Sequence, residues 1–229
     1  MAGGNSDLPV RTASAAAMLV VAGTALWLGG LAWAVFVGLV AFGAFYEWQK
    51  LAQRISATVI GRVLWSLGGI VYFGMAAATL LFLRNAPDMG VPAVMLVVLP
   101  VIATDIGAYF AGRAIGGPKI APSISPSKTW AGLVGGMLAA GAVLALAVHL
   151  SGDNNVAVGY LPLYFAAGAL IAVIAQAGDF FESWMKRRAG VKDSGSLIPG
   201  HGGLFDRTDG LIAVLFVIGL CVVVTAGSA

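Results

Sequence analysis

Long apolar runs without a charged residue limit most strongly what this chain can fold into. Six such runs fill most of the sequence: residues 12–46, 63–83, 89–104, 129–152, 154–178 and 210–229. A helix needs roughly 20 apolar residues to cross the hydrocarbon core of a bilayer. With 59% hydrophobic residues and a mean hydropathy of +0.93, the chain does not have the composition of a soluble globular domain. The sequence therefore predicts an integral membrane protein.

The number of helices follows from the lengths of these runs. The first run has 35 residues, which is enough for two helices, and Gly29 and Gly30 predict the turn between them. The fourth helix reaches full length only if it extends over about residues 91–112 and includes Asp105. The prediction is an all-α bundle of about seven transmembrane helices, or eight or nine pieces if some are broken. It forms a single transmembrane domain, residues 12–229, after a short tail, residues 1–11.

The basic residues predict how the helices are oriented in the membrane. Lys and Arg are enriched in cytoplasmic loops. With seven helices, 12 of the 13 basic residues fall on one side, and only Arg84 falls on the other. The N-terminus and the polar loops are therefore predicted to face the cytoplasm, at a cell inner membrane. The net charge of +3 is explained by this asymmetry, so no nucleic-acid partner is expected.

Residues 104–136 form the first of two polar regions. Asp105 lies about two helical turns from Arg113, with Tyr109 on the same face between them. A carboxylate in a membrane span costs about 2.5 to 3.5 kcal/mol on insertion scales, so it normally lines a polar cavity or pairs with a cation. The simpler alternative to a functional cavity is an ion pair between Asp105 and Arg113.

The same region contains a predicted helix start. Ser125 followed by Pro126 is typical of an N-cap and a first helical residue. The start of such a helix presents free backbone N–H groups, here next to Ser127, Lys128 and Thr129. The combination predicts a phosphate-binding site.

Residues 178–210 form the second polar region. One stripe of the sixth helix, at i, i+3, i+4 and i+7, contains Asp179, Glu182, Ser183 and Lys186. The seventh helix begins with Asp206 and Asp209, and the loop between the two helices contains Gly200, Gly202 and Gly203. Carboxylates are ligands for a hard divalent cation, the basic side chains suit phosphates, and glycines allow close backbone approach. Magnesium with a nucleoside triphosphate is the predicted ligand. A basic cluster that binds anionic lipid head groups would explain residues 186–188 but not the four acids.

The spacing of this second region resembles a known family. Residues 183–209 match, without a gap over 27 positions, the signature of phosphatidate cytidylyltransferases, also called CDP-diacylglycerol synthases. The upstream sequence SPSKTWAG, together with Asp105 and Arg113, resembles a second block of the family. The resemblance covers a catalytic part at about residues 104–229, whereas the N-terminal helices, residues 12–112, match only in general character. One departure is Ala131, where the family often has an acidic or amide side chain.

The resemblance implies a reaction and a set of roles. CTP and phosphatidate would give CDP-diacylglycerol and pyrophosphate, a step of phospholipid biosynthesis, with Mg²⁺ as the cofactor and room for a second cation. Asp179 and Asp206 would share a metal. The implied catalytic residues are Asp179, Asp206, Asp209, Lys192 and Arg207. The implied substrate-binding residues are Asp105, Arg113, Ser125, Lys128, Thr129, Ser183, Lys186, Arg187, Asp193, His201, Gly202 and Gly203.

Two other functions remain open from the sequence. The same chemistry would serve an isoprenoid ether lipid, as in a CDP-archaeol-type synthase. A transporter would use Asp105 and Asp179 along an ion pathway, but no inverted repeat is visible. The expected partners are CTP, phosphatidate and membrane lipids, and the glycine-rich helix faces suggest a homodimer.

Overall fold

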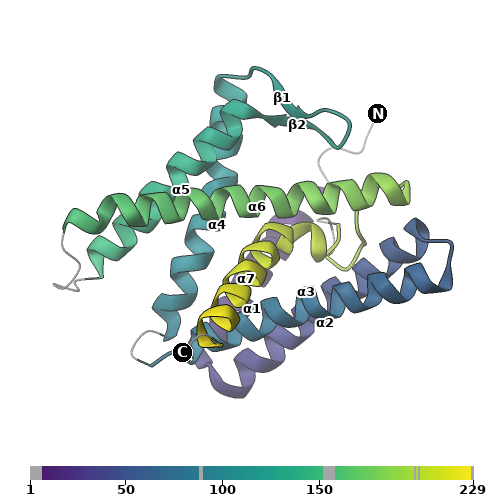
Figure 1. Cartoon of the computed structure of the whole chain (residues 1–229), viewed down its shortest axis with the longest axis horizontal. Helices are drawn as coiled ribbons and strands as arrows, with labels where there is room; N and C mark the ends of the chain where they lie inside the picture. The colour runs from purple at the N-terminus through teal and green to yellow at the C-terminus, as the bar shows by residue number, and fades with distance from the viewer. Residues whose placement is uncertain (1–6, 88–89, 152–157, 199, 201, 228–229) are drawn as a thin grey trace. The chain divides into compact units, whose positions relative to one another are not determined.

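The computed structural model describes residues 7–87, 90–151, 158–198, 200 and 202–227. In this part of the chain the α-helices are α1 (Asp7–Leu28), α2 (Gly30–Ile55), α3 (Val59–Arg84), α4 (Gly90–Ala114), α5 (Trp130–Leu150), α6 (Leu161–Ala189) and α7 (Phe205–Ala226). Two short strands, β1 (Lys119–Ala121) and β2 (Ser125–Thr129), form an antiparallel hairpin between α4 and α5 (Figure 1). A short 3₁₀ helix, Val158–Tyr160, precedes α6. The predicted all-α architecture is confirmed.

The helices have the lengths that a membrane protein needs. The six helices α2 to α7 are long and apolar enough to cross a bilayer, and the apolar part of α1, Thr12–Leu28, is shorter. The first apolar run divides at Gly29, whose φ of 65° lies in the left-handed region that favours glycine. The turn predicted there from the sequence is therefore confirmed. The chain is a polytopic integral membrane protein.

Arg84, which the basic-residue pattern alone does not explain, caps the end of α1. Its Nε donates to the carbonyl of Leu26 at 2.9 Å, and its Nη2 donates to the carbonyl of Trp27 at 3.4 Å. The last carbonyls of a helix have no partner within the helix, and a cation is favourable at that end. Gly29 leaves room for the guanidinium, because a Cβ at that position would collide with it.

Replacement of Arg84 is predicted to lower stability. Arg84→Ala leaves the end of α1 without its charged donor, so the free energy of unfolding should fall by about 1.5 kcal/mol. Thermal unfolding in one detergent measures the change, with Arg54→Ala, an exposed arginine in the last turn of α2, as the control. An unchanged melting temperature for Arg84→Ala would mean that the cap contributes nothing.

The chain forms two compact units. One unit contains Met1–Val91 and Met185–Thr208, and the other contains Pro92–Trp184 and Asp209–Ala229. Both boundaries in the C-terminal half fall inside helices, α6 and α7, so residues 183–209 contribute to both units. These are called unit 1 and unit 2 below. The catalytic part predicted from about residue 104 stays a prediction.

An aromatic cluster fixes the start of α7 in unit 1. Trp48 of α2 is 3% exposed, and its Nε1 donates to the carbonyl of Trp65 at 2.9 Å. Phe205, the first residue of α7, lies with its ring centroid 5.3 Å from that of Phe73 and 6.0 Å from that of Trp48. Large rings that pack in this way hold Phe205, at the start of α7, against α2 and α3.

Small residues bring the helices of unit 2 close together. A Cβ added at Gly107 of α4 would collide with the backbone of Gly135 in α5, and one at Gly168 of α6 would collide with the backbone of α5. Gly178 of α6 is similarly close to the backbone of Asp209 in α7. Helices in lipid associate through such close contacts. The pocket described below lies where α4, α5 and α6 meet β2.

Candidate active site

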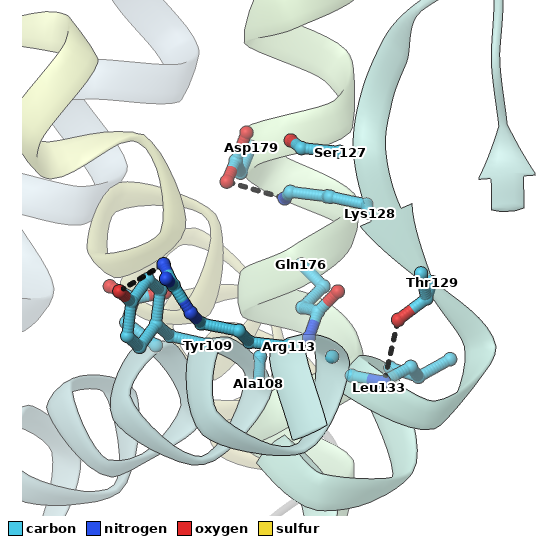
Figure 2. A pocket seen from close by; sticks show the side chains of 12 residues that line it. Ala108, Tyr109, Arg113, Ser127, Lys128, Thr129, Leu133, Gln176 and Asp179 are labelled. Carbon is cyan, nitrogen blue, oxygen red and sulfur yellow. Dashed lines mark hydrogen bonds and ion pairs between the residues drawn. The ribbon is translucent and has the colours of Figure 1, made fainter. Parts of the chain in front are cut away.

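A pocket of about 340 Å³ lies in unit 2 among α4, β2, the start of α5 and α6 (Figure 2). It is lined by Asp105, Ala108, Tyr109, Gly112, Arg113, Ser127, Lys128, Thr129, Gly132, Leu133, Gln176 and Asp179. Its volume is in the range of small-molecule sites. The lining combines two cations with two carboxylates, which suits a ligand that carries several phosphates.

Lys128 and Asp179 form an ion pair in this pocket, and Figure 2 shows the two side chains pointing toward one another from β2 and α6. The other carboxylate oxygen of Asp179 accepts from the Ser183 hydroxyl at 3.3 Å. Lys128 also lies over the ring of Phe180, 4.6 Å from its centroid. The side chains of the pair are 19% and 34% exposed, so a ligand in the pocket can reach both.

Asp105 lines the pocket, as expected for a carboxylate in a membrane span. The simpler alternative, an ion pair with Arg113, is wrong. Arg113 instead donates from Nη1 to the hydroxyl of Tyr109 at 3.2 Å (Figure 2). In the described residues no ion pair joins Arg113 to Asp105. Since the Asp105 side chain is exposed, its carboxylate is available to a ligand.

The helix start predicted at Ser125 is also wrong. Residues 125–129 form β2, and α5 begins at Trp130 because Thr129 is the N-cap, its Oγ1 accepting from the backbone N–H of Gly132 at 3.0 Å. Pro126 is tolerated because β2 belongs to a sheet of two strands, both of them edges. At the start of α5 as the structure has it, two backbone N–H groups have partners, because Gly132 donates to Thr129 Oγ1 and Trp130 donates to the carbonyl of Pro118. Ser125 is not among the pocket residues, although Lys128 and Thr129 are.

Three carboxyl groups of unit 2, those of Asp105, Asp179 and Asp209, lie close together. Asp179 is close enough to Asp105 and to Asp209 to repel both, and Lys128 attracts both. In the described part of the chain, no three His, Cys, Asp or Glu side chains form a complete set of metal ligands. Mg²⁺ usually keeps several waters and takes only one or two carboxylates plus substrate phosphates. The pocket carboxylates therefore fit a magnesium ion that binds together with a nucleotide.

Asp206, in the first turn of α7, is held by hydrogen bonds within unit 1. Its Oδ1 accepts from Lys186 Nζ at 2.7 Å, and its Oδ2 accepts from the N–H and hydroxyl of Ser194 and from the N–H of Gly203, each at 2.9 Å. A carboxylate offers about four lone-pair sites, so these donors use most of its capacity. Asp206 therefore fixes both ends of the segment from Ser194 to Gly203.

The other residues of the signature fall into three groups. Lys192 and Asp193 are exposed on the segment after α6, while Arg187 and Arg207 are exposed on α6 and α7. Gly202 has a φ of 84°, which is why the chain needs glycine there. His201 lies outside the described residues. Because Asp179 and Asp206 belong to different units, the metal that they were predicted to share stays a prediction.

Three polar residues with structural evidence for a role were missed from the sequence. Gln176 is 7% exposed and lines the pocket (Figure 2). Glu47 and Ser194 are 0% and 4% exposed, and they are hydrogen-bonded to one another in unit 1. The sequence does indicate a role for Glu47, because a carboxylate between Tyr46 and Trp48, at the end of an apolar run, is unfavourable in a membrane span unless it has a polar partner.

Comparison with known proteins adds to this geometry. The sequence profile described as "Cytidylyltransferase family" matches residues 56–225. A phosphatidate cytidylyltransferase of Brucella suis biovar 1 is 33% identical over 252 residues, covering 91% of this chain and 90% of that protein. Proteins of the same name from Rickettsia bellii and Haemophilus influenzae are 35% and 36% identical, over 82% and 74% of this chain and 78% and 59% of their own lengths.

Proposed function

Because the chain belongs to the cytidylyltransferase family, we propose that it is a phosphatidate cytidylyltransferase, which converts CTP and phosphatidate into CDP-diacylglycerol and pyrophosphate. The observation that carries this proposal is the pocket in a membrane-spanning unit where Lys128 and Asp179 meet. A lysine suits the phosphates of both substrates, and the carboxylates suit a divalent cation that accompanies CTP.

In the proposed reaction an oxygen of the lipid phosphate attacks the α-phosphorus of CTP. The new P–O bond forms as the bond from the α-phosphorus to the bridging oxygen breaks, and pyrophosphate leaves. The attacking oxygen is already anionic at neutral pH, so no serine, cysteine or histidine nucleophile is required. The protein must hold two anions together and neutralise the charge on the transferring and leaving groups.

The cations of the pocket supply the first part of that task. Lys128 and Arg113 are proposed to bind phosphate oxygens, and Lys128 is held ready by Asp179 and by the ring of Phe180. The amide of Gln176 faces the same pocket and can donate or accept a hydrogen bond to orient the bound substrate. From the signature, the proposed phosphate-binding residues are Lys186, Arg187, Lys192 and Arg207.

Mg²⁺ is the proposed cofactor. When bound, it would neutralise charge on the phosphates of CTP. Asp179 is the proposed ligand in unit 2, and Asp105 and Asp209 lie close to it. Asp206 is the second metal ligand that the resemblance implies.

Access from the membrane is supported by exposed apolar side chains beside the pocket. Tyr109 lines it, and Tyr109, Phe110 and Trp130 are each more than half exposed. In a bilayer, such side chains lie against lipid. Phosphatidate is proposed to arrive sideways from the cytoplasmic leaflet of the inner membrane, and CTP from the cytoplasm.

Incubation of the purified protein with CTP tests the proposal. The protein in detergent receives CTP labelled at the α-phosphate and one of three additions: diacyl phosphatidate, an isoprenoid ether-lipid phosphate, or no lipid, each with and without Mg²⁺. Labelled lipid is expected with phosphatidate and Mg²⁺. Preference for the ether lipid would favour the archaeol-type reaction, and no labelled lipid under any condition would contradict the proposal and favour a transporter.

Removal of the pocket lysine should reduce turnover. Lys128→Ala is expected to lose at least about tenfold in rate, because a charge-assisted bond to phosphate contributes about 1.5 to 3 kcal/mol. Arg188→Ala is the control, since Arg188 is an exposed cation at the end of α6 that is not part of the pocket. Product formation at saturating substrate is the measurement. Equal losses in the two variants would mean that the basic residues act only as a general anchor for anionic lipid.

A further inference from the structure

Glu47 lies in α2, ahead of residues 56–225 that the family profile matches, yet it contacts the signature region directly. Its side chain is fully buried, at 0% exposure. Its Oε2 accepts from the Ser194 hydroxyl at 3.0 Å and from the backbone N–H of Phe205 at 2.8 Å. Phe205 begins α7, so Glu47 satisfies one of the N–H groups that a helix leaves without a partner at its start.

The segment before α7 is shaped to admit this carboxylate. A Cβ at Gly195 would collide with Oε1 of Glu47, and a Cβ at Gly203 would approach Oε2 to 2.5 Å. Ser194 is held from two sides, because its hydroxyl lies 3.0 Å from Glu47 Oε2 and 2.9 Å from Asp206 Oδ2, and its single proton is shared between the two carboxylates. Glu47 and Asp206 therefore contact the same segment, and Glu47 does so from α2, which is distant in the sequence.

The other oxygen of Glu47 takes part in no ion pair within the described residues. In the described residues Oε1 is buried with no hydrogen-bond partner, and no cation pairs with the carboxylate. A buried oxygen without a hydrogen bond is unfavourable, so an apolar residue would be more stable at this position. The presence of a glutamate there indicates that the hydrogen bonds of Oε2 matter. Those contacts depend on the reach of the side chain and on its acceptor atom.

We propose that Glu47 is a positioning residue for the reaction proposed above, on which this inference rests. Through Ser194 and the N–H of Phe205 it fixes the segment before α7 and the first turn of that helix. It thereby sets the position of the Lys186–Asp206 pair, whose atoms lie 2.7 Å apart. The hydrogen bonds, and not the negative charge, perform this task.

Three substitutions separate reach from charge. Glu47→Gln keeps an acceptor oxygen at the same reach but removes the charge, Glu47→Asp keeps the charge but shortens the side chain, and Glu47→Ala removes both. A displacement of about 1 Å can cost about 100-fold in rate. We therefore expect kcat to fall at least about tenfold for the Asp and Ala variants and to fall much less for the Gln variant, with KM for CTP nearly unchanged in all three. Gln49→Ala is the matched control. Gln49 lies on the same helix as Glu47 and accepts a hydrogen bond from Ser66 of α3, and the variant should keep the kcat of the wild type.

Amide hydrogen exchange in residues 194–208 supplies a measurement that needs no turnover. Exchange at Ser194 and Phe205 should quicken in the Asp and Ala variants and stay close to wild type in the Gln variant. An Asp variant that matches or exceeds the Gln variant in kcat and in protection would overturn the inference, as would a wild-type kcat in all three. If the wild-type protein makes no CDP-lipid, the proposed function fails, and the exchange pattern still decides whether Glu47 holds this segment.

Discussion

Asp179→Asn should fold and insert like the wild type and lose nearly all turnover. The carboxamide keeps the shape of the side chain but removes the negative charge that a hard divalent cation requires, and it no longer pairs with Lys128. The effect on stability should be small. Both partners of the pair are partly exposed, and such pairs contribute up to about 1 kcal/mol.

Two measurements on the same preparation of Asp179→Asn decide whether Asp179 is a metal ligand or only a structural partner of Lys128. Melting temperature reports the fold, and magnesium-dependent formation of CDP-lipid reports the reaction, with Arg188→Ala as the reference. An Asn variant that is well folded and still substantially active would exclude Asp179 as a metal ligand. A variant that melts early but keeps its rate would show that Asp179 is only a structural partner of Lys128.

Asp206→Asn should lose both activity and stability. Asp206 and Lys186 are 11% and 16% exposed, and the amide group that replaces Oδ1 would place a donor against the lysine ammonium. If the amide turned the other way, it would face the three donors on Oδ2. Breaking a buried pair by removing one partner costs about 3 kcal/mol. Since 1 kcal/mol corresponds to about 2 to 4 °C in a chain of this size, the melting temperature should fall by several degrees.

A double substitution separates the two roles of Asp206. In Asp206→Asn combined with Lys186→Met, no lysine ammonium faces the introduced amide, so part of the lost melting temperature should return while turnover stays absent. The comparison requires thermal unfolding and CDP-lipid formation for the two single variants and the double variant. Asp206→Asn with the wild-type melting temperature would contradict the structural role, and a double variant that recovered its rate would contradict the catalytic one.

The helices were predictable because a bilayer imposes a length and a composition on each span. The turn at Gly29 and the acids that begin α7 carry local signals, and both lie where the sequence predicts them. The hairpin before α5 was not predictable in this way. Ser125 followed by Pro126 has the local pattern of a helix start, and only the pairing of β2 with β1 and the Thr129 cap decide against it.

The side-chain partners of individual residues also could not be predicted from the sequence. The spacing of Asp105 and Arg113 permits an ion pair, but the intervening Tyr109 takes the guanidinium instead. Glu47 and Ser194 are 147 positions apart, and no periodicity relates them. The residue types of the candidate site could be predicted from their chemistry, whereas their partners depend on tertiary packing.

Transfer of label from CTP tests the proposed reaction most directly. Purified protein is given phosphatidate, Mg²⁺ and CTP labelled either at the α-phosphate or at the γ-phosphate, with Asp179→Asn in parallel. The predicted result is that the α label enters the lipid, the γ label leaves as pyrophosphate, and neither moves in the variant. A γ label in the lipid, or CTP that remains intact with folded wild-type protein, would contradict cytidylyl transfer by this chain.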